Sequence, residues 1–339
     1  MKDALKEAMY YVPSGEKNGK PVLCVLCPNR CKIAENKTGR CGIRASNSGK
    51  LYALVYDKYT SINLDPIEKK PLYHFFPGRS ILSIGTAGCN LKCRFCQNYD
   101  ISQAGPFDVP SRRMSSSELV KLASEGGSIG LAYTYNEPMI NFEHLIETSM
   151  AVKKKGLVNV YVTNGYVCKE PLRELMPFID AANVDVKSFE NSFYKKYCDG
   201  ALKPVLETVE TLMENGRHVE ITNLLIPGLN DGEKNIEKLA EWIFSISDEI
   251  PLHFSGYHPC YRMSIEPTPF STLENAKKIA SGKLKHVYLG NVWEKTGSNT
   301  VCPACGVTVI KRHGYETEVI AVKGSKCSNC GAQLNIHGT

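Results

Sequence analysis

The chain has 339 residues, a net charge of +6 and 42% apolar residues, which suffices for one large folded domain with small additions. Its positive charges form no long run, so the composition does not indicate a nucleic-acid partner, and no apolar stretch or signal-peptide core indicates a membrane. Most of its 14 cysteines fall in three tight clusters, and because we expect a cytoplasmic protein, metal binding explains them better than disulfides.

The first predicted segment, residues 1–75, carries four closely spaced cysteines: Cys24, Cys27, Cys31 and Cys41. Four thiolates complete the tetrahedral shell of Zn2+ or hold all four corners of a [4Fe-4S] cluster, and spacing alone does not separate these alternatives. The segment is therefore predicted to hold zinc or a second cluster in a closed site. Such a site either stabilises this part of the chain or relays electrons.

The second predicted segment, residues 76–290, alternates apolar strand-like runs with amphipathic helical stretches. Strands are expected at 81–85, 129–133, 158–162, 182–186, 218–225, 252–257 and 286–289. Helices are expected at 117–125, 140–155, 206–215, 233–246 and 273–280. This alternation is typical of βαβ units, so the predicted fold class is α/β, a partial or full (β/α) barrel with a parallel sheet.

Cys89, Cys93 and Cys96 lie directly after the first predicted strand. In a (β/α) barrel the chemistry lies at the C-terminal ends of the strands, where this loop is expected. Three thiolates hold three corners of a [4Fe-4S] cluster and leave one iron open for a small molecule. A zinc site would need a fourth ligand, and no further His or Cys lies within a dozen residues, so the pattern favours a reactive cluster.

The third predicted segment, residues 291–339, carries two C-x2-C knuckles, each followed by glycine. Their cysteines are Cys302, Cys305, Cys327 and Cys330. This pattern is typical of a zinc ribbon, in which the four thiolates hold one structural Zn2+. So short a segment has too little core to fold well without a metal, which favours the structural role.

The three-cysteine loop, with Phe95 before its last cysteine, resembles the cluster motif of the radical S-adenosylmethionine (SAM) superfamily. The resemblance implies that SAM binds the open iron through its amino and carboxylate groups, and it places Phe95 at the cofactor site. It further implies that an electron from the [4Fe-4S] cluster cleaves SAM to methionine and a 5′-deoxyadenosyl radical. That radical abstracts a hydrogen atom from the substrate.

Two later loops resemble SAM-contacting elements of the superfamily. Residues 135–138 (Tyr-Asn-Glu-Pro) stand where its members have Gly-Gly-Glu-Pro, which implies that Glu137 holds the SAM amino group with Asn136 beside it. A carboxylate facing an ammonium group makes a strong, charge-assisted hydrogen bond. Tyr135 and Asn136 replace both glycines, so the backbone contribution differs. Thr163 and Asn164 resemble the Ser/Thr-Asn-Gly loop of glycyl-radical activating enzymes, a supporting polar loop.

Asp185 and Lys187 resemble the Asp-x-Lys element of the same activating enzymes, which implies contacts to the SAM ribose and carboxylate. Two further side chains are weaker candidates for catalysis. Cys198 offers a hydrogen atom or an extra ligand, although a buried inert thiol is the more common case. His258 faces SAM or the substrate in one interpretation, although a lone histidine is more often structural.

Over nearly its whole length the chain resembles the radical SAM enzymes of the AmmeMemoRadiSam system, relatives of pyruvate formate-lyase activating enzyme. The segments that carry this resemblance are the four-cysteine motif, residues 65–75 (Asp-Pro-Ile-Glu-Lys-Lys-Pro-Leu-Tyr-His-Phe), the cluster loop, residues 226–231 (Ile-Pro-Gly-Leu-Asn-Asp) and the terminal ribbon. The resemblance implies Memo-like and AMMECR1-type proteins as partners. It also implies a low-potential electron donor such as flavodoxin or ferredoxin, and a small-molecule or partner-bound substrate.

Two other functions are compatible with these residues. A glycyl-radical enzyme activase, like pyruvate formate-lyase activating enzyme, would use the same cluster and SAM residues but would need neither the ribbon nor the N-terminal motif. A non-catalytic iron-sulfur or zinc protein, for binding or electron transfer, would have no use for Glu137, Asp185 or Lys187. The sequence does not identify the substrate.

Overall fold

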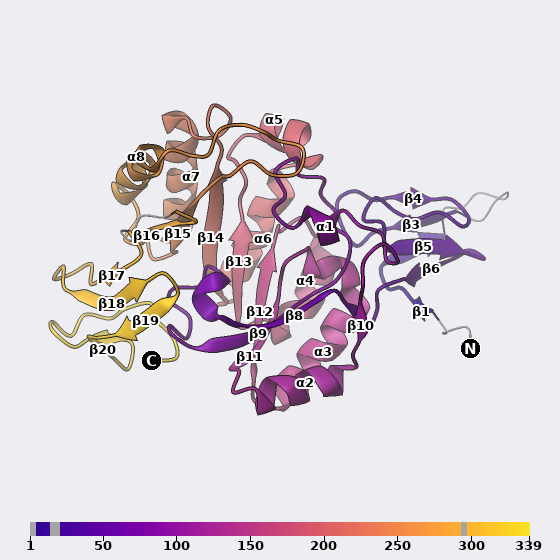
Figure 1. Cartoon of the computed structure of the whole chain (residues 1–339), viewed down its shortest axis with the longest axis horizontal. Coiled ribbons are helices and arrows are strands. Elements are labelled where there is room, and N and C mark those ends of the chain that lie inside the picture. Colours follow the sequence, from indigo (N-terminus) through magenta and orange to yellow (C-terminus); the bar gives the residue numbers. More distant parts are fainter. Residues whose placement is uncertain (1–4, 14–20, 293–296) are drawn as a thin grey trace.

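The structure is a computed structural model that describes residues 5–13, 21–292 and 297–339, so parts of the predicted end segments lie outside the described residues. Its centre is an eight-stranded sheet in the order β16-β15-β14-β13-β12-β11-β9-β8 (Figure 1). The strands from β9 (Ser80–Gly85) to β16 (Val287–Gly290) run parallel, whereas β8 (Ser61–Pro66) runs antiparallel to β9. Because β8 and β16 are the two edges of this sheet, the barrel is partial.

The predicted α/β class is confirmed, and helices alternate with the parallel strands. The inner strands are β11 (Gly130–Tyr133), β12 (Val158–Thr163), β13 (Ala181–Asp185), β14 (His218–Leu225) and β15 (Leu252–Gly256). The helices are α1 (Tyr99–Ser102), α2 (Ser116–Glu125), α3 (Phe142–Lys154), α4 (Lys169–Leu175), α5 (Asn191–Phe193), α6 (Lys203–Glu214), α7 (Glu233–Ile246) and α8 (Phe270–Ser281). The strands are buried along most of their length, as expected where both faces of a parallel sheet are covered.

Small antiparallel sheets lie at the two ends of the long axis of the molecule (Figure 1). Near the N-terminus, β2 (Tyr11–Pro13), β3 (Val22–Cys24) and β4 (Lys32–Ile33) form one sheet, and β1 (Lys6–Glu7), β5 (Arg44–Asn47) and β6 (Lys50–Ala53) form another. The amide of Cys168, after β12, donates to the carbonyl of Leu26 at 3.1 Å. The N-terminal sheets are thereby attached to the C-terminal edge of the barrel, on the same side as the loops that follow its strands.

The opposite edge of the barrel is closed by the segment 67–79 and by the C-terminal strands. Glu220, on β14, is fully buried and accepts from the amides of Tyr73 and His74 at 3.0 and 2.7 Å. Arg312, on β18 (Thr308–His313), donates to Tyr73 O at 2.6 Å. The remaining C-terminal strands are β17 (Thr300–Val301), β19 (Glu316–Val319), β20 (Val322–Lys323) and β21 (Lys326–Cys327). The 65–75 motif therefore joins the barrel to the ribbon.

Among the described residues, no helix combines the length and the apolar character needed to cross a bilayer.

Candidate active site

The three-cysteine loop follows β9 and lies at the C-terminal edge of the sheet, as predicted. Cys93 is buried, and Cys89 and Cys96 are partly exposed. Burial, followed by the neighbouring Glu137 and Cys93, raises the pKa of the Cys89 thiol. Burial and the nearby Cys93 likewise raise the pKa of Cys96. Thiols that face one another in this way ionise together only beside a cation that compensates their charge, so the donor set fits bound iron.

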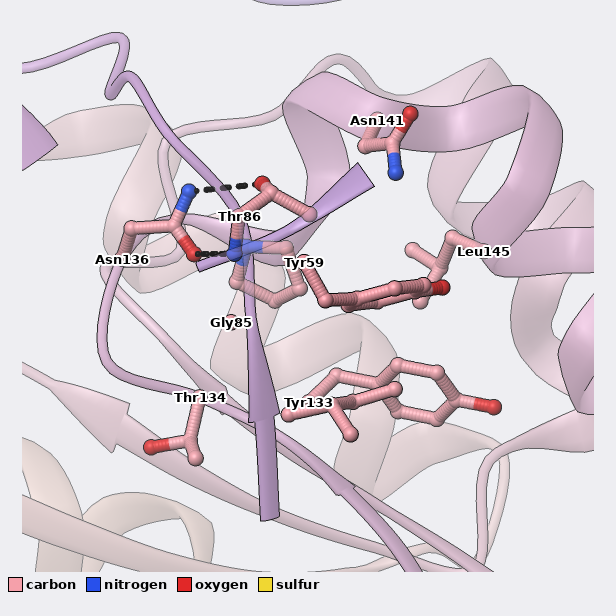
Figure 2. Close-up of a pocket in the computed structure, with 10 residues that line it drawn as sticks. Tyr59, Gly85, Thr86, Tyr133, Thr134, Asn136, Asn141 and Leu145 are labelled. Atoms are coloured by element: carbon pink, nitrogen blue, oxygen red, sulfur yellow. Dashed lines mark hydrogen bonds between the residues drawn. The ribbon is translucent and has the colours of Figure 1, made fainter. Parts of the chain in front are cut away.

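Asn136 braces this loop against the loop that follows β11 (Figure 2). Its Oδ1 accepts from the amide of Thr86 at 3.1 Å, and its Nδ2 donates to Thr86 Oγ1 and Gly88 O, both at 2.9 Å. Gly88 immediately precedes the first cluster cysteine. Asn136 therefore fixes the start of the cluster loop, a role that the glycine it replaces could not perform because glycine has no side chain.

Tyr135, the other replacement, has a left-handed backbone with φ of 71°, which non-glycine residues rarely adopt. Its hydroxyl donates to Asp65 Oδ2 at 2.6 Å, and Lys70 Nζ pairs with the same carboxylate oxygen at 2.7 Å. Burial would raise the pKa of Asp65, but hydrogen bonds from Lys70 and Tyr135 lower it overall. The 65–75 motif thus holds Tyr135 in a conformation that a glycine would adopt without support.

Glu137 joins the loop after β11 to the loop after β12. Its carboxylate accepts from Thr163 Oγ1 at 2.9 Å, from the amide of Asn164 at 2.8 Å and from the amide of Met139 at 3.0 Å. Burial raises the pKa of Glu137 to about 7, although these hydrogen bonds oppose the shift. A carboxylate has about four lone-pair sites, so three donors leave one site for a further donor.

Asn164 connects Glu137 to the cluster loop. Its Nδ2 donates to Asn90 Oδ1 at 2.9 Å and lies 3.6 Å from Cys89 Sγ. A hydrogen bond to a cysteine sulfur influences the properties of the iron that the sulfur would bind. The structure therefore brings Glu137, Thr163 and Asn164 together with the first cluster cysteine.

Asp185 and Lys187 stand at the C-terminal end of β13, and their side chains form an ion pair at 2.6 Å. The Lys187 side chain is 15% exposed and that of Asp185 is 33% exposed. Burial would lower the pKa of Lys187, but Asp185 and the neighbouring Cys93 raise it overall. The pair is thus a charged and partly accessible group beside the cluster loop.

The other predicted site residues occupy different positions around the loop. Phe95 is buried, with its ring centroid 5.8 Å from that of Phe193, so the structure shows it supporting the loop. Cys198 is fully buried next to Cys93, and the pKa of the Cys93 thiol is raised by Cys198 and by burial. His258, after β15, has Nε2 3.3 Å from Asn291 O. Their roles toward SAM or substrate stay predictions.

Sequence reasoning missed two further residues near the cluster loop. Asn90 donates to Tyr166 O at 2.7 Å and accepts from Asn164, so it supports the loop from within. Cys260 Sγ donates to Cys96 O at 3.3 Å. Cys260 follows the predicted strand at 252–257 by three residues, and its place on a strand-end loop was the signal available in the sequence.

The two other cysteine clusters are also assembled in the structure. In the ribbon, the four sulfur atoms lie within 4.8 Å of one another, with Cys302 Sγ 3.7 Å from Cys330 Sγ and Cys305 Sγ 3.8 Å from Cys327 Sγ. This compact arrangement is consistent with the predicted zinc ribbon. The four N-terminal cysteines line a single cavity together with the buried Arg44.

A protein-family model and a solved structure are similar to the barrel that carries this site. Residues 83–243 match the family model of the radical SAM superfamily, and this range includes the cluster loop and all the strands from β11 to β14. A solved structure, SuiB of Streptococcus suis bound to S-adenosylmethionine, shares the fold with a TM-score of 0.50 and 12% identity, over 62% of this chain and 51% of that chain.

Two relatives add to this comparison. The chain is 41% identical over 340 residues to the uncharacterized protein MJ0808 of Methanocaldococcus jannaschii, covering 98% of this chain and 99% of that protein. It is 26% identical over 220 residues to the pyruvate formate-lyase-activating enzyme of Staphylococcus epidermidis, covering 60% of this chain and 85% of that enzyme. Residues 83–243 are thus a radical SAM domain, which implies a [4Fe-4S] cluster and SAM as cofactors.

Proposed function

We propose that the protein is an enzyme that reductively cleaves SAM at a [4Fe-4S] cluster held by Cys89, Cys93 and Cys96, and that abstracts a hydrogen atom from its substrate. When bound, the cluster and SAM supply the 5′-deoxyadenosyl radical. The observation that carries the proposal is the convergence of Glu137 and the Asp185–Lys187 pair on the cluster loop. Together with the cluster loop, these residues come from three separate strand ends, and an electron carrier would not need Glu137, Asp185 or Lys187 at this edge.

Each residue has a chemical task that its environment supports. The Glu137 carboxylate has an acceptor site that suits the ammonium group of SAM. Thr163 and Asn164 donate to the same Glu137 carboxylate and hold it in place. Lys187 suits a carboxylate, and Asp185 accepts from ribose hydroxyl groups. Asn136 positions the loop and is not assigned a contact with the cofactor.

The partners and the compartment are part of the same proposal. The resemblance of the whole chain to AmmeMemoRadiSam-system enzymes supports Memo-like and AMMECR1-type partners, a flavodoxin or ferredoxin as donor, and a cytoplasmic location. The short distances between sulfur atoms in the ribbon support one structural Zn2+. The substrate is proposed to be a small molecule or a partner-bound group.

A second candidate function is activation of a glycyl-radical enzyme. The identity to the Staphylococcus epidermidis pyruvate formate-lyase-activating enzyme favours it, but that similarity covers 60% of this chain. The N-terminal site and the ribbon lie at opposite ends of the barrel, and they are features that a minimal activase does not need. We therefore prefer the first function.

The test is anaerobic reconstitution with iron and sulfide, followed by SAM and dithionite, with 5′-deoxyadenosine measured by chromatography. The intact protein is expected to form it. Cys93→Ala should abolish it while the ribbon keeps its zinc. Cys168→Ala is a matched control, because this buried cysteine belongs to none of the three cysteine clusters. Absence of 5′-deoxyadenosine from the intact protein would contradict the proposal, and formation by the Cys93 variant would contradict the ligand assignment.

A further inference from the structure

The N-terminal cysteines line one pocket. Cys24, Cys27, Cys31 and Cys41 surround it together with the apolar side chains of Leu26, Ile33 and Ile140. An apolar shell around thiolate ligands limits solvent access and so tunes the redox potential of a bound metal group. The lining therefore suits a redox-active group.

The separation of the sulfur atoms favours an iron-sulfur cluster over a single ion. Ligands of one zinc ion lie about 2.3 Å from the metal, which keeps the sulfur atoms of a tetrahedron about 3.8 Å apart, as in the ribbon. In the described part of the chain, only the ribbon has three or more metal-ligating atoms within 4.8 Å of one another. The N-terminal sulfurs are thus more widely spaced, as are those of the cluster loop. In a four-iron cube, each thiolate binds a different iron, which requires wider spacing.

Arg44 supplies an independent observation. It is 1% exposed, it lines the cavity, and its guanidinium pairs with the buried Glu143 at 3.0 Å. Its Nε nevertheless has no hydrogen-bond partner among the described residues. A buried donor without a partner is costly. The inorganic sulfides of an iron-sulfur cluster accept N–H hydrogen bonds, so a cluster in this pocket would offer Nε an acceptor.

We propose that Cys24, Cys27, Cys31 and Cys41 bind a second [4Fe-4S] cluster, and that this cluster passes single electrons to the cluster at Cys89, Cys93 and Cys96. Every iron of the second cluster has a protein thiolate, so it does not bind SAM. The electron transfer rests on the proposed function, whereas the metal assignment does not.

The positions of the two sites support the transfer. Asn29 lines the N-terminal cavity, and its Nδ2 donates to Asn90 O at 2.7 Å, next to Cys89. On the other side of Cys89, a Cβ atom at Gly88 would lie 2.6 Å from Cys41 O. Glycine is therefore required for the close approach of the cluster loop to the backbone of Cys41. Residues adjacent to ligands of each site are therefore in direct contact.

The electron balance is that of a relay. A low-potential donor such as reduced ferredoxin or flavodoxin gives one electron to the second cluster, which changes from the 2+ to the 1+ state. The second cluster then returns to 2+ as the first is reduced from 2+ to 1+. No proton or bond is exchanged in either step.

The metal assignment is tested in a triple variant, Cys89→Ala with Cys93→Ala and Cys96→Ala, which removes the first cluster. After anaerobic reconstitution, we expect about four irons, about four sulfides and one zinc per chain, with the Mössbauer spectrum of a [4Fe-4S] cluster. Adding Cys27→Ala and Cys31→Ala should remove the iron and leave the zinc. If the triple variant contained no iron and about two zinc ions per chain, the proposal would be overturned. Because SAM is absent, this result is independent of SAM cleavage.

If the triple variant fails to fold, the double variant Cys27→Ala/Cys31→Ala in the otherwise intact chain gives the same answer. Its iron content should fall from about eight to about four. The relay is tested by the electron paramagnetic resonance signal of the reduced first cluster. In this double variant, reduction by ferredoxin or flavodoxin should slow at least tenfold relative to the intact protein, while dithionite should still reduce the cluster. Equal rates with the protein donor would overturn the relay.

Discussion

The bracing of the cluster loop by Asn136 gives a prediction whose size follows from the structure. Asn136→Ala removes three close hydrogen bonds, one from the Thr86 amide, one to Thr86 Oγ1 and one to Gly88 O, and a longer one to Ala87 O at 3.4 Å. A net hydrogen bond contributes about 1 kcal/mol, and a buried group left without a partner costs more. The variant should therefore lose about 3 kcal/mol of the free energy of unfolding.

Asn141→Ala is the matched control, since both asparagines line the same cavity (Figure 2). Asn141 Nδ2 makes one hydrogen bond, to Tyr56 O at 3.2 Å, and its Oδ1 has no partner among the described residues. Its loss should cost about 1 kcal/mol. Urea denaturation of the proteins loaded with zinc but lacking iron, followed by circular dichroism, measures both values. Equal losses in the two variants would refute the assignment of Asn136 as the brace. The Asn136 variant should also release iron from the first cluster faster after reconstitution.

Two further predictions concern buried carboxylates. Because burial raises the pKa of Glu137 to about 7, SAM should bind about tenfold more tightly at pH 8 than at pH 6, where the carboxylate is mostly protonated. Equilibrium dialysis with the oxidised protein measures the affinity for SAM at each pH. Glu137→Gln should bind SAM weakly and without this pH dependence. If the affinity of the variant still changed with pH, the pH dependence would belong to another group. Glu220 is buried, which would raise its pKa, but hydrogen bonds from His218 and His253 lower it well below 4.5 overall. Its contribution to stability is complete above about pH 4.5 and declines as the pH falls toward the pKa in the folded protein. Glu220→Gln should thus cost about 3 kcal/mol at pH 7, with a smaller difference in acid. A difference that stays constant down to pH 3 would contradict this account.

The barrel could be predicted because its signals are local. β14 and α7 have the bounds expected from apolar periodicity alone, since each is long and has a regular apolar pattern. α4 was not predicted, because it has only seven residues and contains Pro171, which interrupts a helical pattern. Short elements offer too few residues for a period to be recognised.

The details of the site depend on contacts between distant residues, which local patterns do not encode. The spacing of the three cysteines identified the cluster loop, and the position of Glu137 followed from its resemblance to other loops. The support for Tyr135 comes from Asp65, seventy residues earlier in the chain. The proposal of a cluster rather than zinc at the N-terminal site likewise rests on the arrangement of sulfur atoms in space.

The cluster loop is held by a different segment on each side. Besides Asn136 and Asn164, the carbonyls of Tyr197 and Cys198 accept from the amides of Arg94 and Lys92 at 2.9 and 2.8 Å. After β15, the amide of Arg262 donates to Arg94 O at 2.9 Å. Loops from four strand ends thus fix the backbone that carries the three cysteines. Such preorganisation lowers the ordering cost of binding. Because Asn29 holds Asn90 as well, the N-terminal segment supports the position of the first cluster in addition to its proposed role in electron transfer.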